Sequence, residues 1–286
     1  MARDIDPSLN RRRLRIELRK AREQAGLTQR DAVNGLEWSL SKLLRIEAGT
    51  VGLGVTDLRA LLQLYDVTDA DHVKDLEDAA RGSKGQSWWA PYSDVVSVQY
   101  AQYLGYEGAA NTILMYNPIV LPGLLQTEDY ATALLTPGTT SESRTRQQVE
   151  LRISRQERFF DGEDGPLVNI VLDEAAVRRQ IGGPAVMRRQ LEHIKTMAEH
   201  PRVTIQLLPF SAGAHYGTLT SFIVLGFKDD DDLLFREGPG GGLSNRDDLG
   251  LTARYRECFE DISTIAYQGD RMIELIDTVK ESLVNI

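Results

Sequence analysis

Side chains that can recognise a nucleic acid gather in one short segment of the chain. Ser41, Lys42 and Arg45 fall on one side of the helix that this segment predicts, and Leu43 and Ile46 fall on the other. A lysine can donate to guanine O6 or N7, a serine can hydrogen-bond with either type of base, and an arginine binds phosphate. This chemistry and spacing predict a helix that reads the major groove of DNA.

Two further groups complete the predicted contacts. Leu40 and Leu44 also face outward, where their side chains can meet a thymine methyl group. Thr28 and Gln29 begin the preceding helix, whose positive N-terminus favours a phosphate. The predicted base contacts are Leu40, Ser41, Lys42 and Leu44. The predicted phosphate contacts are Thr28, Gln29, Ser39, Arg45 and Arg19.

Helices must position these residues. Thr28 and Ser39 are good N-caps for two short helices that a tight turn joins, which is the arrangement of a helix-turn-helix. Apolar residues at helical spacing, with Gly26 as a stop, predict another helix before them. The N-terminal part is therefore expected to be an all-α domain of five helices. These helices are residues 11–25, 28–36, 39–47, one that starts at 56, and 69–81.

The same segment resembles a known family. Thr28-Gln29 and Ile46-Glu47-Ala48-Gly49, at this interval, resemble the lambda-repressor/Cro-like helix-turn-helix regulators of the xenobiotic-response-element type. The resemblance covers roughly residues 11–80 and implies DNA binding. It also implies that Glu47 bonds across the helical bundle and reads no base. Glu37-Trp38 departs from the family pattern, which commonly has a glycine and an aliphatic residue in this turn. The alternative is a helical bundle that binds protein.

Charge is distributed unevenly along the 286 residues. Residues 1–65 hold twelve Lys and Arg against eight Asp and Glu, a net charge of +4. The rest of the chain holds 21 against 34, a net charge of −13, so the whole chain carries −9. A basic N-terminal part on an acidic body fits a DNA-binding domain attached to a domain that does not bind DNA.

A polar stretch separates the two parts. Residues 82–87, Gly-Ser-Lys-Gly-Gln-Ser, have the composition of a linker. We therefore expect a helix-turn-helix DNA-binding domain over residues 1–81 and a C-terminal regulatory and dimerisation domain over residues 88–286.

The C-terminal domain is expected to be mainly helical with a small β-sheet, which makes the fold class α+β. Residues 167–172 and 203–208 are rich in β-branched side chains, and the helical pieces between these strands are compatible with a crossover unit. Residues 220–227 and 233–235 are predicted to form a hairpin. The expected helices are residues 95–116, one that Thr127 caps, 141–161, 174–181, 184–199, 247–257 and 270–284.

Four sequence blocks follow one another in this domain. They are Leu121–Ala131, Val171–Ala176, Gly182-Gly-Pro with Met187-Arg, and Leu207–His215. Together they resemble the C-terminal half of actinobacterial antitoxin-like transcriptional regulators, a domain of unknown function. In that family, regulators are commonly paired with a small partner protein encoded nearby, so the resemblance implies such a partner here.

Residues that could catalyse a reaction or bind a metal are few. Asp173 and Glu174 follow a predicted strand, where catalytic acids often lie, but acidic residues also favour a helix N-terminus. His215 has no second metal ligand at short spacing, and His193 and His200 are better explained by ordinary core or surface positions. We therefore predict no catalytic residue, no metal site and no cofactor.

Aromatic residues cluster after the linker, and two interpretations of them stay open. They can form core or a dimer interface, or they can line an apolar pocket for a small aromatic or lipid-like effector. The residues predicted for a ligand or partner surface are Trp88, Trp89, Tyr92, Tyr103 and His215.

The remaining features limit the class of protein. No run of apolar residues is long enough for a membrane span, the N-terminus lacks the apolar core of a signal peptide, and Cys258 stands alone. We expect a cytoplasmic, homodimeric regulator that binds an inverted-repeat operator in double-stranded DNA and is modulated by a small partner protein. The alternatives are a regulator whose C-terminal domain senses a small molecule, and an enzyme tethered to DNA.

Overall fold

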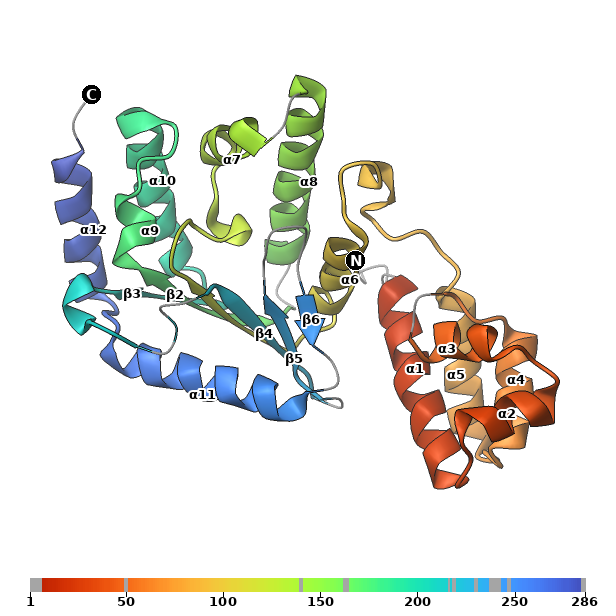
Figure 1. Cartoon of the computed structure of the whole chain (residues 1–286). Coiled ribbons are helices and arrows are strands. Elements are labelled where there is room, and N and C mark those ends of the chain that lie inside the picture. Colours follow the sequence, from red (N-terminus) through yellow and green to blue (C-terminus); the bar gives the residue numbers. More distant parts are fainter. Residues whose placement is uncertain are drawn as a thin grey trace. The chain divides into compact units, whose positions relative to one another are not determined.

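The computed structural model divides the chain into two compact units, Met1–Pro91 and Tyr92–Ile286 (Figure 1). Each unit is described by itself below. The residues that the structure describes are 7–283, apart from 49–50, 139–140, 162–164, 216, 218–219, 229–230, 237–242 and 246–247.

The N-terminal unit is built from helices, and it confirms the expected five-helix domain. The first helix begins at Pro7, before the predicted Arg11, because proline is well tolerated in the first turn of a helix. The fourth begins at Val55 with Gly54 as its N-cap, where Thr56 had been expected to cap it. The helices are α1 (Pro7–Gln24), α2 (Gln29–Leu36), α3 (Leu40–Glu47), α4 (Val55–Leu64) and α5 (Ala70–Gly82).

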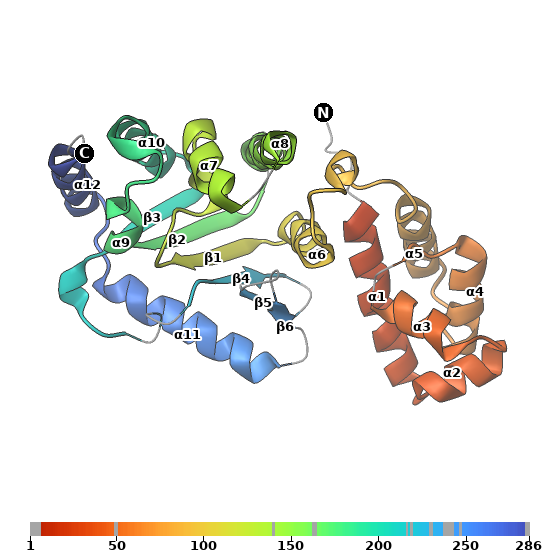
Figure 2. The ribbon, with the colours of Figure 1, turned by 45° about the horizontal axis from the view of Figure 1, so that its top comes forward.

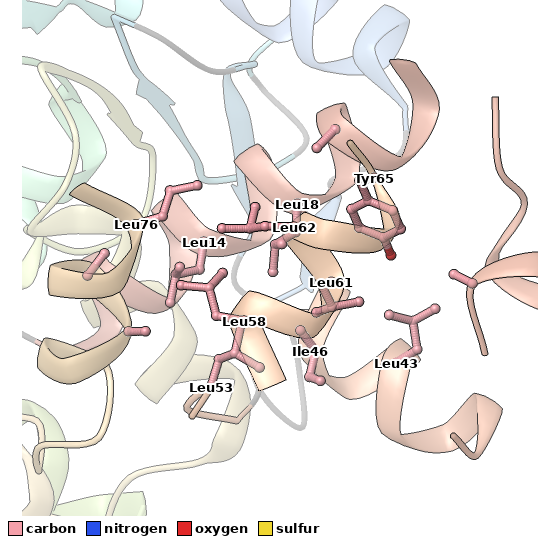
Figure 3. Packing of buried hydrophobic residues seen from close by; sticks show 14 of the residues in the cluster. Leu14, Leu18, Leu43, Ile46, Leu53, Leu58, Leu61, Leu62, Tyr65 and Leu76 are labelled. Atoms are coloured by element: carbon pink, nitrogen blue, oxygen red, sulfur yellow. The ribbon is translucent and has the colours of Figure 1, made fainter. Parts of the chain in front are cut away.

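All five helices contribute to the core of this unit (Figure 3). Leu18 of α1, Leu43 of α3, Leu58 and Leu61 of α4, and Leu76 of α5 are fully buried. Burying one such side chain stabilises the fold by roughly 1.5–3 kcal/mol. This core fixes the position of α3, because Leu43 anchors its inner face.

The C-terminal unit is organised around a mixed sheet in the order β3-β2-β1-β4-β5-β6. Strands β1, β2 and β3 run parallel, and β4, β5 and β6 extend the sheet from β1 in antiparallel fashion. The strands are β1 (Thr112–Asn117), β2 (Leu167–Asp173), β3 (Val203–Leu208), β4 (Phe222–Gly226), β5 (Leu233–Arg236) and β6 (Leu243–Asn245).

Helices cover both faces of this sheet (Figure 2). Helix α11 packs on one face, where its Cys258, Phe259 and Ile262 meet Tyr116 and Val224 of the sheet. Helices α7, α8, α10 and α12 lie on the opposite side. The helices are α6 (Val98–Glu107), α7 (Glu128–Leu135), α8 (Glu142–Phe160), α9 (Glu174–Arg178), α10 (Gly183–Ala198), α11 (Leu249–Ile265) and α12 (Asp270–Ser282).

The sheet tests the strand predictions. The crossover unit is confirmed, because β2 and β3 pair in parallel with α9 and α10 between them. The hairpin is confirmed by the antiparallel pairing of β4 with β5.

The helix expected over residues 95–116 is wrong in its second half. Helix α6 ends at Glu107, and Thr112–Asn117 forms β1 in the middle of the sheet. A central strand that is buried on both faces is a continuous apolar run without the alternation that identifies a half-buried strand. The tyrosines of α6 recur at helical spacing, so the sequence pattern predicted that this helix continues through the apolar residues of β1.

Candidate nucleic-acid interface

The turn between α2 and α3 holds the helix-turn-helix together. Glu37 ends α2 in the left-handed conformation, with φ of 54°, at the position where the resembled family commonly has a glycine. The backbone N–H of Trp38 donates to the carbonyl oxygen of Val33 at 2.9 Å. The Ser39 hydroxyl then accepts from the backbone N–H of Lys42 and starts α3. The turn is short, and these hydrogen bonds fix the direction of α3.

The solvent-exposed face of helix α3 carries both polar and apolar side chains. Leu40 and Leu44 are 40% and 43% exposed, whereas Leu43 and Ile46 are 1% and 5% exposed. Ser41 and Arg45 are exposed on the same outer face. The sequence predicts this outward orientation for Leu40, Ser41, Leu44 and Arg45. Together with Ala48, these residues line a shallow surface hollow.

Lys42 lies on this face but is held by two neighbours. Its Nζ is 2.9 Å from Oδ1 of Asp57 in α4 and 3.5 Å from the centre of the Trp38 ring. Half-exposed ion pairs and cation–π contacts are each worth about 1 kcal/mol or less. Such contacts orient the amine along the surface and leave it able to exchange Asp57 for another acceptor.

Sequence reasoning missed the role of Trp38 and Asp57 in holding Lys42. Trp38 was visible as a departure in the turn, and its ring takes the place of an aliphatic residue. Asp57 gave no signal, because an acidic residue in the first turn of a helix is ordinary.

Glu47 ties α3 to the rest of the bundle. Its carboxylate accepts from Arg22 Nε at 2.7 Å and from Arg22 Nη2 at 3.2 Å, and both side chains are buried. The hydrogen bond to Glu47 outweighs burial and raises the pKa of Arg22. Gln29 Nε2 donates to the same carboxylate at 2.7 Å. The structure thus shows Glu47 bonding across the bundle, as the resemblance implies.

The candidate phosphate contacts lie around this network. Thr28 forms a capping box with Asp31, and these hydrogen bonds lower the pKa of Asp31. The Gln29 side chain points inward to Glu47. The donors that face outward at this end of α2 are therefore the backbone N–H groups of its first turn. Arg19 is exposed and pairs with Glu23 at 3.0 Å. Arg45 Nε donates to the Ser41 carbonyl at 3.3 Å.

The residues predicted for a ligand or partner surface each have contacts of their own. The Trp88 and Trp89 rings stack edge to face, with centroids 5.7 Å apart, in the N-terminal unit. In the C-terminal unit, the hydroxyl groups of Tyr92 and Ser154 lie 3.3 Å apart. Tyr103 is buried and donates to Glu107 at 2.6 Å.

His215 makes a separate contact. Its Nε2 lies 4.0 Å from Oδ2 of Asp173, at the carboxyl end of β2, and its ring meets Tyr116 edge to face. Tyr116 donates to the same carboxylate at 3.3 Å. Glu174 instead accepts from the Phe210 backbone and from Arg178, so its carboxylate is bound within the fold.

The remaining histidines and the one cysteine are considered for metal binding or catalysis. Burial lowers the pKa of both His193 and His200. Burial also raises the pKa of the Cys258 thiol to about 11. Within the described ranges, no group of three or more His, Cys, Asp or Glu side chains is placed to hold a metal ion. No helix among the described residues is long and apolar enough to cross a membrane.

Comparison with known families matches both units. Residues 13–74 match a family described as "Helix-turn-helix domain". Residues 100–278 match a family described as "Domain of unknown function (DUF5753)". No curated protein and no solved structure matches the chain. The helix-turn-helix match spans α2, α3 and the turn between them, which is the part that exposes the face described above.

Proposed function

Because the chain belongs to the DUF5753 family and carries a helix-turn-helix domain, we propose that it is a sequence-specific DNA-binding transcriptional regulator. The observation that carries the proposal is the outer face of α3. Leu40, Ser41, Leu44 and Arg45 are exposed there, and the buried residues on the opposite side of the helix anchor it in the core.

The roles of the residues follow from their chemistry. Ser41 and Lys42 donate to base edges, and Leu40 and Leu44 contact thymine methyl groups. Arg45 and Arg19 bind phosphates on either side, and the N-termini of α2 and α3 bind phosphate through backbone N–H groups near Thr28, Gln29 and Ser39. Lys42 leaves Asp57 when the more highly charged DNA approaches.

The proposed architecture is a homodimer in the cytoplasm. One short recognition helix contacts few base pairs, and pairing two of them on an inverted repeat doubles the sequence that is read. Residues 1–81 would form the DNA-binding domain, residues 82–87 the linker, and residues 88–286 the dimerisation and regulatory domain. A small partner protein would bind this last domain and modulate DNA binding.

The test is selection of DNA sequences by the purified full-length protein, followed by binding measurements on the selected duplex. We expect an inverted-repeat sequence. Lys42→Ala should weaken binding by about 1–3 kcal/mol and relax the preference at one base position in each half-site. Arg45→Ala should weaken binding to all sequences alike. The salt dependence of the affinity should fall by the amount that about one phosphate contact contributes.

Lys74→Ala is the matched control, because it removes the same charge from an exposed position of α5 in the same unit. It should leave affinity unchanged. If Lys42→Ala and Lys74→Ala behave alike, or if no sequence is enriched, α3 does not read DNA.

A further inference from the structure

A cavity of about 100 Å³ lies at the carboxyl end of β1 in the C-terminal unit. In α/β sheets, ligands bind beyond the carboxyl ends of the strands. The cavity is lined by residues of α6, β1, the loop after β1, α8, β4 and β5. A cavity of roughly 150 Å³ can hold a benzene molecule, so this one suits a ligand of only a few heavy atoms.

Two guanidinium groups line the cavity. Arg152 and Arg155 of α8 both line the cavity, and among the described lining residues there is no carboxylate. The side chain of Arg155 is 6% exposed, and Glu107 behind it accepts from Nε at 2.7 Å and from Nη2 at 2.5 Å. Burial disfavours the charged guanidinium, but Glu107 outweighs it, and the pKa of Arg155 is raised. Arg155 therefore stays charged at the wall of the cavity.

The loop after β1 leaves room next to these two arginines. Gly123 has no side chain, and a Cβ there would lie 3.2 Å from Nη1 of Arg155 and 3.4 Å from Nε of Arg152. Arg152 Nη1 donates to Oε1 of Gln126 in the same loop. The loop belongs to the block Leu121–Ala131, to which the proposed function assigns no role.

Buried amide side chains hold this loop rigid. Gln126 Nε2 donates to the Leu121 carbonyl at 2.6 Å, and Gln190 of α10 donates to the Leu125 carbonyl at 2.6 Å. Gln156 of α8 donates to the carbonyls of Gly123 at 2.6 Å and Gln126 at 2.8 Å. The wall of the cavity is thus preformed, which reduces the entropy that binding must overcome.

A buried acceptor on the cavity wall has no partner. Asn117, the last residue of β1, is 9% exposed and lines the cavity. In the described part of the chain, its Oδ1 is shielded from solvent and accepts no hydrogen bond. Leaving a buried acceptor unsatisfied destabilises the fold, so this position calls for a donor. Tyr100 and Phe222 supply aromatic surface in the same cavity.

We propose that this cavity binds a small hydroxycarboxylate. Its carboxylate lies against Arg152 and Arg155, its hydroxyl donates to Asn117 Oδ1, and its apolar carbons pack on the aromatic side chains. An amine in place of the hydroxyl would bring a positive charge next to the two guanidinium groups, which disfavours amino acids. This site is independent of the DNA-binding face, and its test does not require DNA.

The test is calorimetric titration and thermal unfolding of the full-length protein with a size series of glycolate, lactate and 2-hydroxyisobutyrate. Two matched series separate the contacts. The primary amides of these acids lack the charge, and acetate, propionate and isobutyrate lack the hydroxyl. We expect at least one hydroxy acid to bind and to raise the Tm of the C-terminal unit, by about 5–10 °C at one hundred times Kd. Its amide and its deoxy analogue should each bind about tenfold more weakly or worse.

Two variants test the residues independently. Arg152→Met should lower the affinity for the hydroxy acid about tenfold or more, while Arg144→Met, which removes the same charge from an exposed position of α8, should not change it. Asn117→Asp keeps the side-chain shape and adds a negative charge, so it should abolish binding of the acids. The proposal is wrong if no acid in the series binds, if amide and acid bind equally, or if Arg152→Met and Arg144→Met behave alike.

Discussion

The N-terminal unit and the C-terminal unit each contain a buried arginine–glutamate pair, but the surroundings of the two pairs differ. Arg22 and Glu47 join α1 to α3 and stabilise the back of a helix whose outer face is exposed. Arg155 and Glu107 join α8 to α6 at the wall of a cavity. The first unit offers an exposed helix face for a large partner, and the second offers an enclosed space for a small one.

This difference separates two kinds of binding site. An exposed helix face binds through contacts that form only when the partner arrives, so its side chains lie at the surface. An enclosed site must be preformed, so its charged and polar groups are buried and mutually hydrogen-bonded before any ligand enters. Substitutions in each ion pair should destabilise only the unit that contains it, and the loss of stability should be larger in the C-terminal unit.

The largest effect is expected from Glu107→Ala. This change leaves Arg155 as a buried charge without its carboxylate, which destabilises the C-terminal unit by about 3–5 kcal/mol. Denaturant unfolding followed by circular dichroism measures it. Tryptophan fluorescence should be unaffected, because Trp38, Trp88 and Trp89 all lie in the N-terminal unit. Exposed Glu157→Ala on α8 is the control. A loss below about 1 kcal/mol would show that the pair contributes little.

Glu47→Ala should act in the other unit and somewhat less strongly. Its partner Arg22 is buried but also donates to the Leu27 carbonyl at 2.9 Å, so the guanidinium keeps one acceptor. We expect a loss of about 3 kcal/mol in the transition seen by tryptophan fluorescence. Asp71→Ala, which removes an exposed carboxylate of α5, is the control. The two units would be coupled, against our expectation, if Glu47→Ala shifted the C-terminal transition equally.

Tyr65 makes the N-terminal unit sensitive to alkaline pH. Burial, together with the nearby carboxylate of Glu47, raises the pKa of Tyr65 to about 12, above the ordinary value of 10. Because the folded state favours the neutral phenol, the stability it contributes is complete below pH 10 and is lost as the pH rises through 12. Tyr65→Phe should remove most of this loss in unfolding measured from pH 9 upward. Equal pH profiles for the two proteins would contradict the assignment.

The smallest effect is a gain in stability from Glu37→Gly. Glu37 adopts φ of 54°, which glycine adopts without the steric penalty that a side chain meets. The N-terminal unit should gain about 0.5–1 kcal/mol, and DNA affinity should stay the same. Glu37→Ala keeps the Cβ and serves as the control, with no gain expected. A loss of stability in Glu37→Gly would mean that the side chain of Glu37 supports the turn.

The two units also differ in how far the sequence predicts them. Thr28, Ser39 and the apolar spacing of Leu43 and Ile46 are local signals, and they predict α2, α3 and the facing of the recognition helix. The same signals do not predict where a long side chain finds its partner. The contact of Lys42 with Asp57 joins residues fifteen positions apart, and it depends on how α3 packs against α4.

In the C-terminal unit, the missed strand β1 hid the candidate ligand site. Asn117 and Gly123 reach the cavity only because β1 lies in the middle of the sheet and its following loop turns back over α8. Arg155 is one of many arginines on a charged helix, and only its packing against Glu107 distinguishes it. Long-range packing defines this site. The sequence points to Tyr103 and to the block Leu121–Ala131, but it does not show that they meet Asn117 and Arg155 at one cavity.

The central claim is that the outer face of α3 selects DNA sites. Genome-wide immunoprecipitation of the tagged full-length protein tests it most directly, with a Ser41→Ala/Arg45→Ala variant and a Lys74→Ala control expressed at equal levels. We predict discrete sites that share an inverted repeat, their loss in the double variant and their retention in the control. Discrete sites that persist in the double variant, or an absence of discrete sites for the wild type, would contradict the claim.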